Sequence, residues 1–352
     1  MPFTSRIVGP SFSSGISRFS SGITRRDLLK SLPGAALVAA VACRRSPPPY
    51  DPARFVHPAT SDVAILPANR YDLDFSEVIA HGLRLLKLDV RNKKVLLKPN
   101  LVEFERDRVI NTHPAVIAGA AQALLRAGAS RVVVAEGPGH RRDIDFLVTG
   151  TGLLDYVRDI GVPFVDLNHD DVRRVRLGSG FMALPNLALP AEVVDADLVV
   201  SMPKLKTHHW MGMTCSLKNL FGVVPGAVYG WPKNILHFRG IENSILDLAA
   251  TIRPRLSIVD AVVGMEGDGP IMGKAKSVGC LVIGTDAVAV DGTCARLIGI
   301  RPEKLAYLAR AGEFLGNLAE ESILQRAEPL TRFATSFELL PSFQSLLNGQ
   351  GG

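Results

Sequence analysis

Short apolar runs alternate with segments of helical period along most of this chain. The runs are rich in Val, Ile and Leu and end at turn residues, which is typical of strands buried on both faces. The strands that this pattern predicts cover residues 63–66, 94–97, 131–135, 162–166, 198–202, 256–259 and 280–283. Helices are expected over residues 75–86, 112–128, 152–160, 241–252, 286–298 and 302–311. Such alternation predicts βαβ units, and therefore an α/β fold with a mostly parallel sheet flanked by helices.

Two segments break this alternation. Residues 168–190 are polar and irregular, and they are a candidate for a small inserted subdomain. Residues 203–239 are rich in Gly, Pro, Trp and His, which indicates a long loop with short helical pieces. Loops of this length inside a domain are usually functional. No internal repeat stands out, so one domain is expected over 61–318, followed by a C-terminal tail over 319–352.

The N-terminal segment has the order of an export signal. Arg25 and Arg26 lie in a heptad, Thr24–Lys30, that resembles the twin-arginine export motif. The apolar run that follows, over 35–42, is far shorter than the ~20 residues that cross a bilayer as a helix. We therefore expect a signal peptide over 1–42 and the twin-arginine translocase as a partner. The alternative is a mildly basic N-terminal arm.

Two modes of cleavage fit the end of this signal. Ala40-Val41-Ala42-Cys43 resembles a lipobox, in which Cys43 is lipidated, and Ala40-Val41-Ala42 also satisfies the A-x-A rule for ordinary cleavage. The protein is thus expected to be exported, either free in the periplasm or anchored at the membrane surface. Membrane contact is expected only if Cys43 is lipidated. A linker over 43–60 then precedes the domain.

The net charge of +6 is concentrated in the signal. Residues 1–42 hold five basic residues and one acidic residue, which leaves a charge of +2 on the rest of the chain. A nearly neutral domain without a basic stripe interleaved with aromatic residues has no general attraction to nucleic acid. We therefore expect no nucleic-acid partner.

Sequence motifs for the common cofactors are missing. The four cysteines form no CxxC pair, so an iron–sulfur cluster is not expected. The sequence also has no P-loop, G-x-S-x-G or HExxH motif. The cofactor therefore stays unidentified, with a divalent metal as the candidate.

Polar side chains follow most of the predicted strands. They are Lys98, Asn100, Glu136, His140, Lys204, Lys206, His208, Asp260, Glu266, Asp268 and Asp286. In parallel α/β sheets, ligands bind at the carboxyl ends of the strands. If all of these strands run parallel, the polar groups converge on one edge of the sheet, which predicts a site there.

Lysines dominate this set. Lys98 and Lys204 each leave an apolar strand beside a proline, where an unpaired charge is costly to bury. A small anionic ligand, carrying phosphate or carboxylate, would suit several such lysines. The expected anion-binding residues are Lys98, Asn100, Lys204, Lys206, Lys218 and Asn219. The alternative is that the lysines extend along apolar surface to solvent.

A histidine and several acids supply the candidate chemistry. The expected catalytic residues are His208, Asp286 and Asp291. Asp291 lies on an apolar helical face, and pairing with a buried lysine is the alternative for it. An acidic patch beside a Gly-rich loop, formed by Asp260, Glu266 and Asp268, is the candidate metal site, with His208 as a further ligand. The patch also fits a simple turn.

Four blocks of this sequence resemble the family catalogued as domain of unknown function 362 (DUF362). The blocks are Lys98–Asn100, Met202–His208, Ser216–Gly222 and Asp286–Asp291, and the resemblance extends over Val63 to Gly316. It implies that the signature positions are Lys98, Asn100, Lys204, Lys206, His208, Lys218, Asn219, Asp286 and Asp291. Some members append a ferredoxin-like module that this sequence lacks. The family implies no settled activity.

Three functions fit these observations. The first is an exported enzyme, an oxidoreductase or another metal- or cofactor-dependent enzyme, whose lysines hold an anionic substrate or cofactor. The second is a non-catalytic binding protein for an anion or metal, periplasmic or lipid-anchored. The third is an accessory lipoprotein without a working site.

Overall fold

The computed structural model describes residues 48–139 and 143–347. Arg25, Arg26, Cys43 and His140 lie outside these residues, and so does the whole predicted signal. Among the helices of the described residues, none is long and apolar enough to cross a membrane.

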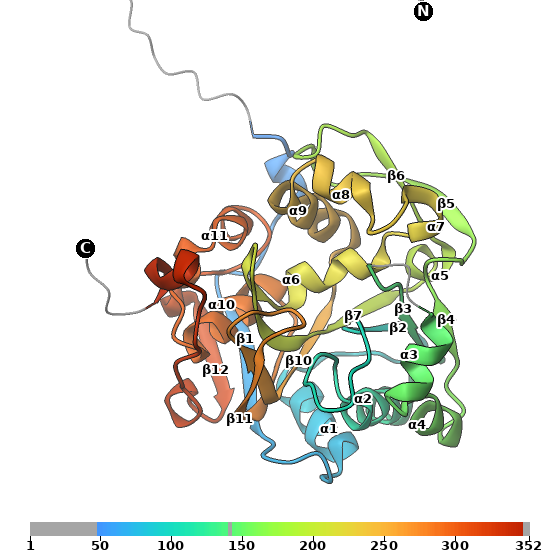
Figure 1. The fold of residues 1–352 in the computed structure, drawn as a ribbon, viewed down its shortest axis with the longest axis vertical. Helices are drawn as coiled ribbons and strands as arrows, with labels where there is room; N and C mark the ends of the chain where they lie inside the picture. Colours follow the sequence, from blue (N-terminus) through green and yellow to red (C-terminus); the bar gives the residue numbers. More distant parts are fainter. Residues whose placement is uncertain (1–47, 140–142, 348–352) are drawn as a thin grey trace, which may run out of the picture. The chain divides into compact units, whose positions relative to one another are not determined.

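One large sheet runs through the described residues, with the strand order β12-β1-β11-β10-β7-β2-β3-β4 (Figure 1). The strands are β1 (Ser61–Pro67), β2 (Lys94–Pro99), β3 (Arg131–Glu136), β4 (Phe164–Asp166), β7 (Leu198–Met202), β10 (Leu256–Glu266), β11 (Lys274–Gly284) and β12 (Ile323–Ala327). Neighbours from β10 to β4 are all parallel, and β12 is parallel to β1. β11 runs antiparallel to both of its neighbours, β1 and β10. The prediction of an α/β fold with a mostly parallel sheet is confirmed.

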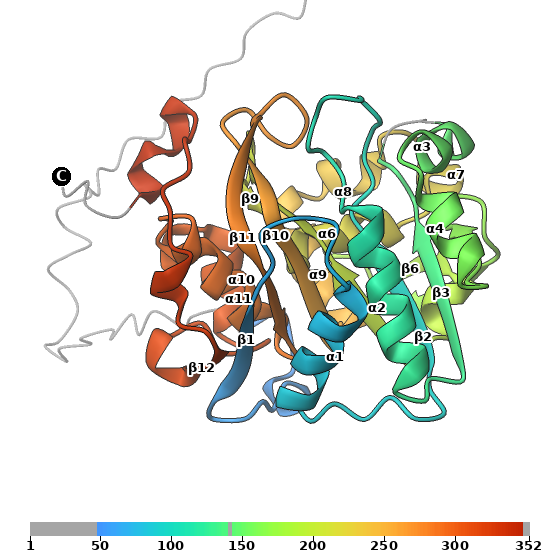
Figure 2. The same ribbon diagram turned by 90° about the horizontal axis from the view of Figure 1, so that it is seen from below.

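Helices pack on both faces of this sheet (Figure 1, Figure 2). On one face lie α1 (Phe75–Leu85), α2 (Pro114–Arg126), α3 (Ile144–Gly150) and α4 (Leu153–Asp159), and on the other lie α6 (Ser216–Asn219), α9 (Ile241–Ile252), α10 (Ala287–Leu297) and α11 (Ala306–Gly312). In β2, Val95 and Leu97 belong to the core under α1 and α2, whereas Leu96 belongs to the opposite core. Because side chains alternate across a strand, the fully apolar runs of the sequence serve two cores at once.

Helices α1 and α2 begin at caps that the sequence encodes. Asp74 accepts hydrogen bonds from the first backbone N–H groups of α1, and His113 does so for α2, with Pro114 at the first helical position. Gly119 lets the two helices pack closely, because a Cβ there would collide with Phe75. Both helices pack on the sheet and help to hold its strands in place. The loops that carry the polar residues follow the carboxyl ends of these strands.

Both segments that interrupt the predicted alternation are structured. The first contains a separate antiparallel pair, β5 (Val172–Arg176) and β6 (Asn186–Pro190). The second, expected as a long loop with short helical pieces, contains the short helices α6, α7 (Gly226–Tyr229) and α8 (Asn234–Phe238), and in addition the strands β8 (Lys204–His208) and β9 (Gly212–Thr214). β8 joins the main sheet beside β10. Its sequence, Lys-Leu-Lys-Thr-His, is mostly polar although every residue in it is buried, and polarity alone therefore hid the strand.

The folded body extends beyond residues 61–318 on both sides. Tyr50 stacks on Phe314 with 4.0 Å between the ring centroids. At the other end, β12 pairs with β1, and Phe337 is buried in the core. The linker expected over 43–60 is therefore docked on the domain from Tyr50 onward, and much of the expected tail belongs to the fold.

Candidate functional site

A cavity of about 420 Å³ lies at the carboxyl ends of β2, β3 and β8, and we call it the carboxyl-edge cavity. Six of the residues expected to bind an anion or act in catalysis line it: Lys98, Asn100, Lys206, His208, Lys218 and Asn219. Its lining also includes Glu136, Trp210, Thr214, Phe221, Lys233 and His237. The predicted convergence of polar groups at this edge is thus present for most of the set.

Lys98 and Glu136 form a buried ion pair between the ends of β2 and β3. Lys98 Nζ lies 2.7 Å from Glu136 Oε2 and 2.7 Å from the carbonyl oxygen of Pro99. Its third hydrogen bond is donated to Asn219 Oδ1 at 3.1 Å. Burial lowers the pKa of Lys98, and the charge of Glu136 opposes that shift. Any side chain at Gly222 would collide with both members of the pair.

Lys206 is buried and has no carboxylate partner in the described part of the chain. Its Nζ donates to the carbonyl oxygens of Ile110 at 2.9 Å and Pro270 at 3.2 Å. Burial, and then the positive charge of Lys204, lowers the pKa of Lys206 well below its ordinary value. In its charged form Lys206 has three donors, so one N–H would be left for an anionic ligand that keeps it protonated.

Lys233 is a second buried lysine held only by main-chain carbonyls. Its Nζ donates to the carbonyl oxygens of Gly137, Phe221 and Gly222 at 2.6, 3.1 and 3.0 Å. Burial lowers the pKa of Lys233 to about 7, although the charge of Glu136 opposes this shift. Lys233 therefore adds positive potential to the cavity without offering it a free donor.

Lys218 differs from the other lysines because its amine makes no hydrogen bond to any residue that the structure describes. Its Nζ lies 3.9 Å from the centroid of the Phe221 ring. Burial, and then the charge of Lys98, lowers the pKa of Lys218 to about 8. The next residue, Asn219, is fixed because its Nδ2 donates to the carbonyl oxygen of Lys98 at 2.9 Å.

His208 is neutral in this environment. Burial, and then the charge of Lys218, lowers the pKa of His208 to about 2. Its Nδ1 accepts a hydrogen bond from the backbone N–H of Trp210 at 3.1 Å, so the proton of the neutral ring lies on Nε2. His208 can therefore donate a hydrogen bond inside the cavity.

Two further side chains of the cavity have unsatisfied polar atoms. Asn100 Oδ1 and Thr214 Oγ1 are buried and have no hydrogen-bond partner among residues 48–139 and 143–347. Such atoms are uncommon in folded proteins, since each costs about 1–3 kcal/mol. Both line the cavity, where a polar ligand would satisfy them.

Lys204 does not line the cavity, contrary to the prediction. It lies opposite Asp260 in the register between β8 and β10. Its Nζ lies 2.5 Å from Asp260 Oδ2, 2.8 Å from the hydroxyl of Tyr71 and 3.1 Å from the carbonyl oxygen of Val263. All three donors are used, so Lys204 is a structural residue with no donor left for an anion.

Asp286 and Asp291 also lie outside the cavity. Because β11 is antiparallel, its carboxyl end carries Asp286 to the opposite edge of the sheet. There Asp286 caps α10 and accepts from Ser61 Oγ at 2.7 Å. Asp291 is buried in α10 and accepts from the backbone N–H groups of Ser216 and Leu217 at 2.7 and 3.1 Å. Burial raises the pKa of Asp291 to about 7. Both acids are thus placed away from the lysines with which they were expected to act, and their contacts here are those of a helix cap and of a support for the start of α6.

The three acids of the predicted metal site are not brought together. Asp260 is bound to Lys204, and Glu266 accepts from the backbone N–H of Glu338 at 2.9 Å. Asp268 lies 3.7 Å from His209. Within the described residues, no group of three or more His, Cys, Asp or Glu side chains is arranged to hold a metal ion. The expected metal site therefore does not form, because each acid has a separate partner.

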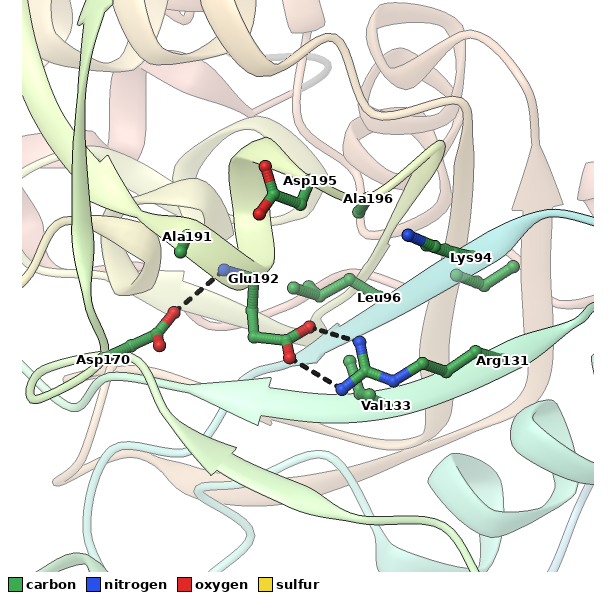
Figure 3. Close-up of a pocket in the computed structure, with 10 residues that line it drawn as sticks. Lys94, Leu96, Arg131, Val133, Asp170, Ala191, Glu192, Asp195 and Ala196 are labelled. Carbon is green, nitrogen blue, oxygen red and sulfur yellow. Dashed lines mark hydrogen bonds and ion pairs between the residues drawn. The ribbon is translucent and has the colours of Figure 1, made fainter.

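The described surface also has other hollows, outside the carboxyl-edge cavity. Figure 3 shows one of about 180 Å³ at the amino ends of β2 and β3. In it, Arg131 donates to both carboxylate oxygens of Glu192 at 2.8 and 2.7 Å, and Asp170 accepts from the backbone N–H of Glu192 at 2.9 Å. The charges of Arg131 and Glu192 in this hollow are therefore paired with each other. A second hollow, of about 570 Å³, contains Asp286 in its capping role.

The chain belongs to the family described as domain of unknown function (DUF362), whose model matches residues 95–296. Over 232 residues it is 32% identical to Thylakoid-associated protein sll1697 of Synechocystis sp. (strain ATCC 27184 / PCC 6803 / Kazusa), which covers 63% of this chain and 68% of that protein. The predicted family membership is confirmed. The matched residues include every lysine of the carboxyl-edge cavity.

A crystal structure of a protein from Thermotoga maritima is similar at 18% identity, with a TM-score of 0.34. The match covers 62% of this chain and 58% of that one, so the chain spans less than two thirds of that protein. This similarity is too low to support a statement about function.

Sequence reasoning did not assign Lys233 or Thr214 to the site. Lys233 follows Trp231-Pro232 in the segment expected as a loop, and its left-handed backbone, with φ of 68°, turns it into the cavity. Thr214 lies on β9, a strand of three residues that the sequence pattern did not reveal. The clustering of Gly, Pro and Trp around Lys233 was the signal that could have marked it.

The Lys204–Asp260 pair gives a stability prediction. Asp260→Asn leaves Lys204 buried without a counter-charge, which should cost about 3–5 kcal/mol in the free energy of unfolding measured with urea at neutral pH. Asp89→Asn removes an exposed ion pair with Arg91 and should change that free energy little. Equal effects of the two substitutions would contradict the structural role of Lys204.

Proposed function

We propose that this protein binds a small ligand with a phosphate or carboxylate group in the carboxyl-edge cavity, and that it acts on this ligand as an enzyme. The charge imbalance of the cavity carries the proposal. Lys98 is neutralised by Glu136. Lys206, Lys218 and Lys233 have no carboxylate partner in the described residues.

Burying unpaired ammonium groups is costly, because desolvation is not repaid by a counter-charge. The depressed pKa values of Lys218 and Lys233 are the consequence of that cost. An anion in the cavity would offset part of that cost. The interaction would be strong because the surrounding protein screens charge less than water does.

The free donors indicate how such a ligand would lie. Lys206 has one unused N–H, and Lys218 has its whole amine available. Thr214 Oγ1 adds an unsatisfied hydroxyl. The rings of Phe221 and Trp210 also line the cavity and would pack against a flat or apolar part of the ligand.

An enzyme is favoured over a purely binding protein by the state of Lys218. An amine with a pKa of about 8 exchanges its proton near neutral pH, which a salt-bridged binding lysine does not do. The non-catalytic binding protein is the alternative, and the same anion site would serve it.

The test of the anion site uses thermal unfolding of the purified protein with inorganic phosphate or oxalate. We expect both anions to raise the unfolding temperature of the wild type. Lys206→Met should weaken the apparent affinity about 10- to 100-fold, because it removes a charge-assisted hydrogen bond. Lys93→Met, at an exposed lysine on the amino edge of β2, should leave it unchanged. No stabilisation of the wild type, or equal stabilisation of Lys206→Met, would contradict the proposal.

For the location of the protein, we propose export by the twin-arginine route to the periplasm or the membrane surface. The support is the Arg25-Arg26 heptad and the thylakoid association named for the Synechocystis relative. An anchor at Cys43 would keep Tyr50 within about 25 Å of the bilayer, since Tyr50 lies seven residues after Cys43 and the chain is docked from Tyr50 onward.

Replacement of both Arg25 and Arg26 by lysine should therefore leave the full-length chain in the cytoplasm, as measured by cell fractionation. Cys43→Ala should in addition move the exported protein from the membrane to the soluble periplasmic fraction if Cys43 is lipidated. Normal export of the double lysine variant would show that another signal is used.

A further inference from the structure

The amine of Lys218 lies over the Phe221 ring, 3.9 Å from its centroid, and makes no hydrogen bond to a described residue. Lys98, Lys206 and Lys233 each donate to two or three protein oxygens. Lys218 donates to none among the described residues, although it lines the same cavity. Lys218 is half-buried, and holding its amine at the cavity wall without an oxygen acceptor carries a cost of desolvation.

The backbone around Lys218 is fixed on both sides. Asp291 accepts hydrogen bonds from the N–H groups of Ser216 and Leu217, which begin α6. On the other side, Asn219 Nδ2 donates to the carbonyl oxygen of Lys98 at 2.9 Å and to Ser201 Oγ at 3.1 Å. The side chain of Lys218 is thus held over the Phe221 ring while its nitrogen stays accessible from the cavity.

We propose that Lys218 is a nucleophile that forms a Schiff base with an aldehyde or ketone group of the anionic ligand. This inference rests on the proposed function for the anionic part of the ligand. It narrows the ligand to an anionic carbonyl compound, such as a 2-oxo acid or a phosphorylated aldehyde. Reactive lysines of this kind are typically desolvated or placed beside another cation. Lys218 is half-buried at the cavity wall, and burial together with the charge of Lys98 lowers its pKa.

The step balances without an oxidant or a reductant. The lone pair of the neutral Lys218 amine forms a C–N bond to the carbonyl carbon, and the π electrons of the C=O bond move to oxygen. A proton passes from nitrogen to that oxygen, which gives a carbinolamine. Loss of the oxygen as water, with formation of the C=N bond, completes the Schiff base. One amine and one carbonyl are consumed, and one water is released.

The surroundings of Lys218 support this chemistry. With its pKa lowered to about 8 by burial and by the charge of Lys98, about one tenth of the amine is neutral at pH 7, far more than for an ordinary lysine. His208 is neutral and carries its proton on Nε2, so this N–H can donate a hydrogen bond to the carbonyl oxygen of the ligand, which later leaves as water. Lys206 supplies the unused N–H that would hold the anionic group.

The experiment uses pyridoxal 5′-phosphate, an anionic aldehyde, as the probe. The folded protein is incubated with about one equivalent, reduced with borohydride, and analysed by intact mass and peptide mapping. We expect a single adduct on Lys218, and about tenfold less of it with pyridoxal, which lacks the phosphate. Lys218→Arg keeps the charge and should abolish the adduct, whereas Lys93→Arg should leave it in place. Thermal unfolding shows that each variant is folded.

Labelling spread over exposed lysines, with Lys218 unmodified in the wild type, would overturn the inference even if no variant folds. In that case the anion site stands if inorganic phosphate still stabilises the wild type. If Lys218 is labelled equally by pyridoxal and by its phosphate, and phosphate does not stabilise the protein, the nucleophile stands and the anion site fails.

Discussion

The buried ion pair between Lys98 and Glu136 is the interaction on which the site depends. It joins the carboxyl ends of two adjacent parallel strands, and through Asn219 it also fixes α6 to the sheet. Because Gly222 packs directly against the pair, the segment that follows α6 is drawn across the strand ends. The pair also engages Glu136, the carboxylate that the described residues contribute to the cavity lining. Among the described residues, the remaining lysines of the cavity have carbonyl oxygens or an aromatic ring as partners. This imbalance of charge is the basis of the proposed anion site.

The site combines fixed and free groups. Lys233 and Lys98 use all of their donors within the protein and act through their charge, whereas Lys206 and Lys218 retain donors for a ligand. The acids expected to act in catalysis serve this arrangement indirectly. Asp291, for example, holds the start of α6, which carries Lys218. In the proposed function, Lys206 and Lys218 are therefore the lysines that would meet the ligand.

The sequence was sufficient to predict the α/β fold and most of the lysines of the cavity, because apolar runs and strand ends are local features. It could not reveal the direction of β11, and Asp286 was therefore placed at the wrong edge. Lys204 was assigned to the anion because its partner, Asp260, lies 56 residues away and meets it only through the pairing of β8 with β10. Lys233 was not predicted as a site residue because its position depends on a left-handed backbone inside an irregular segment. The errors at Asp286 and Lys204 concern contacts between distant parts of the chain, and periodicity carries no information on such contacts.

A crystal structure of the protein with tungstate would test whether the lysines of the carboxyl-edge cavity hold an anion, because anomalous scattering locates the ion without a prior assumption. We expect a peak inside the cavity, within hydrogen-bond distance of Lys206 Nζ and Lys218 Nζ. Peaks found only at exposed basic residues, with none in the cavity, would rule out an anion site there.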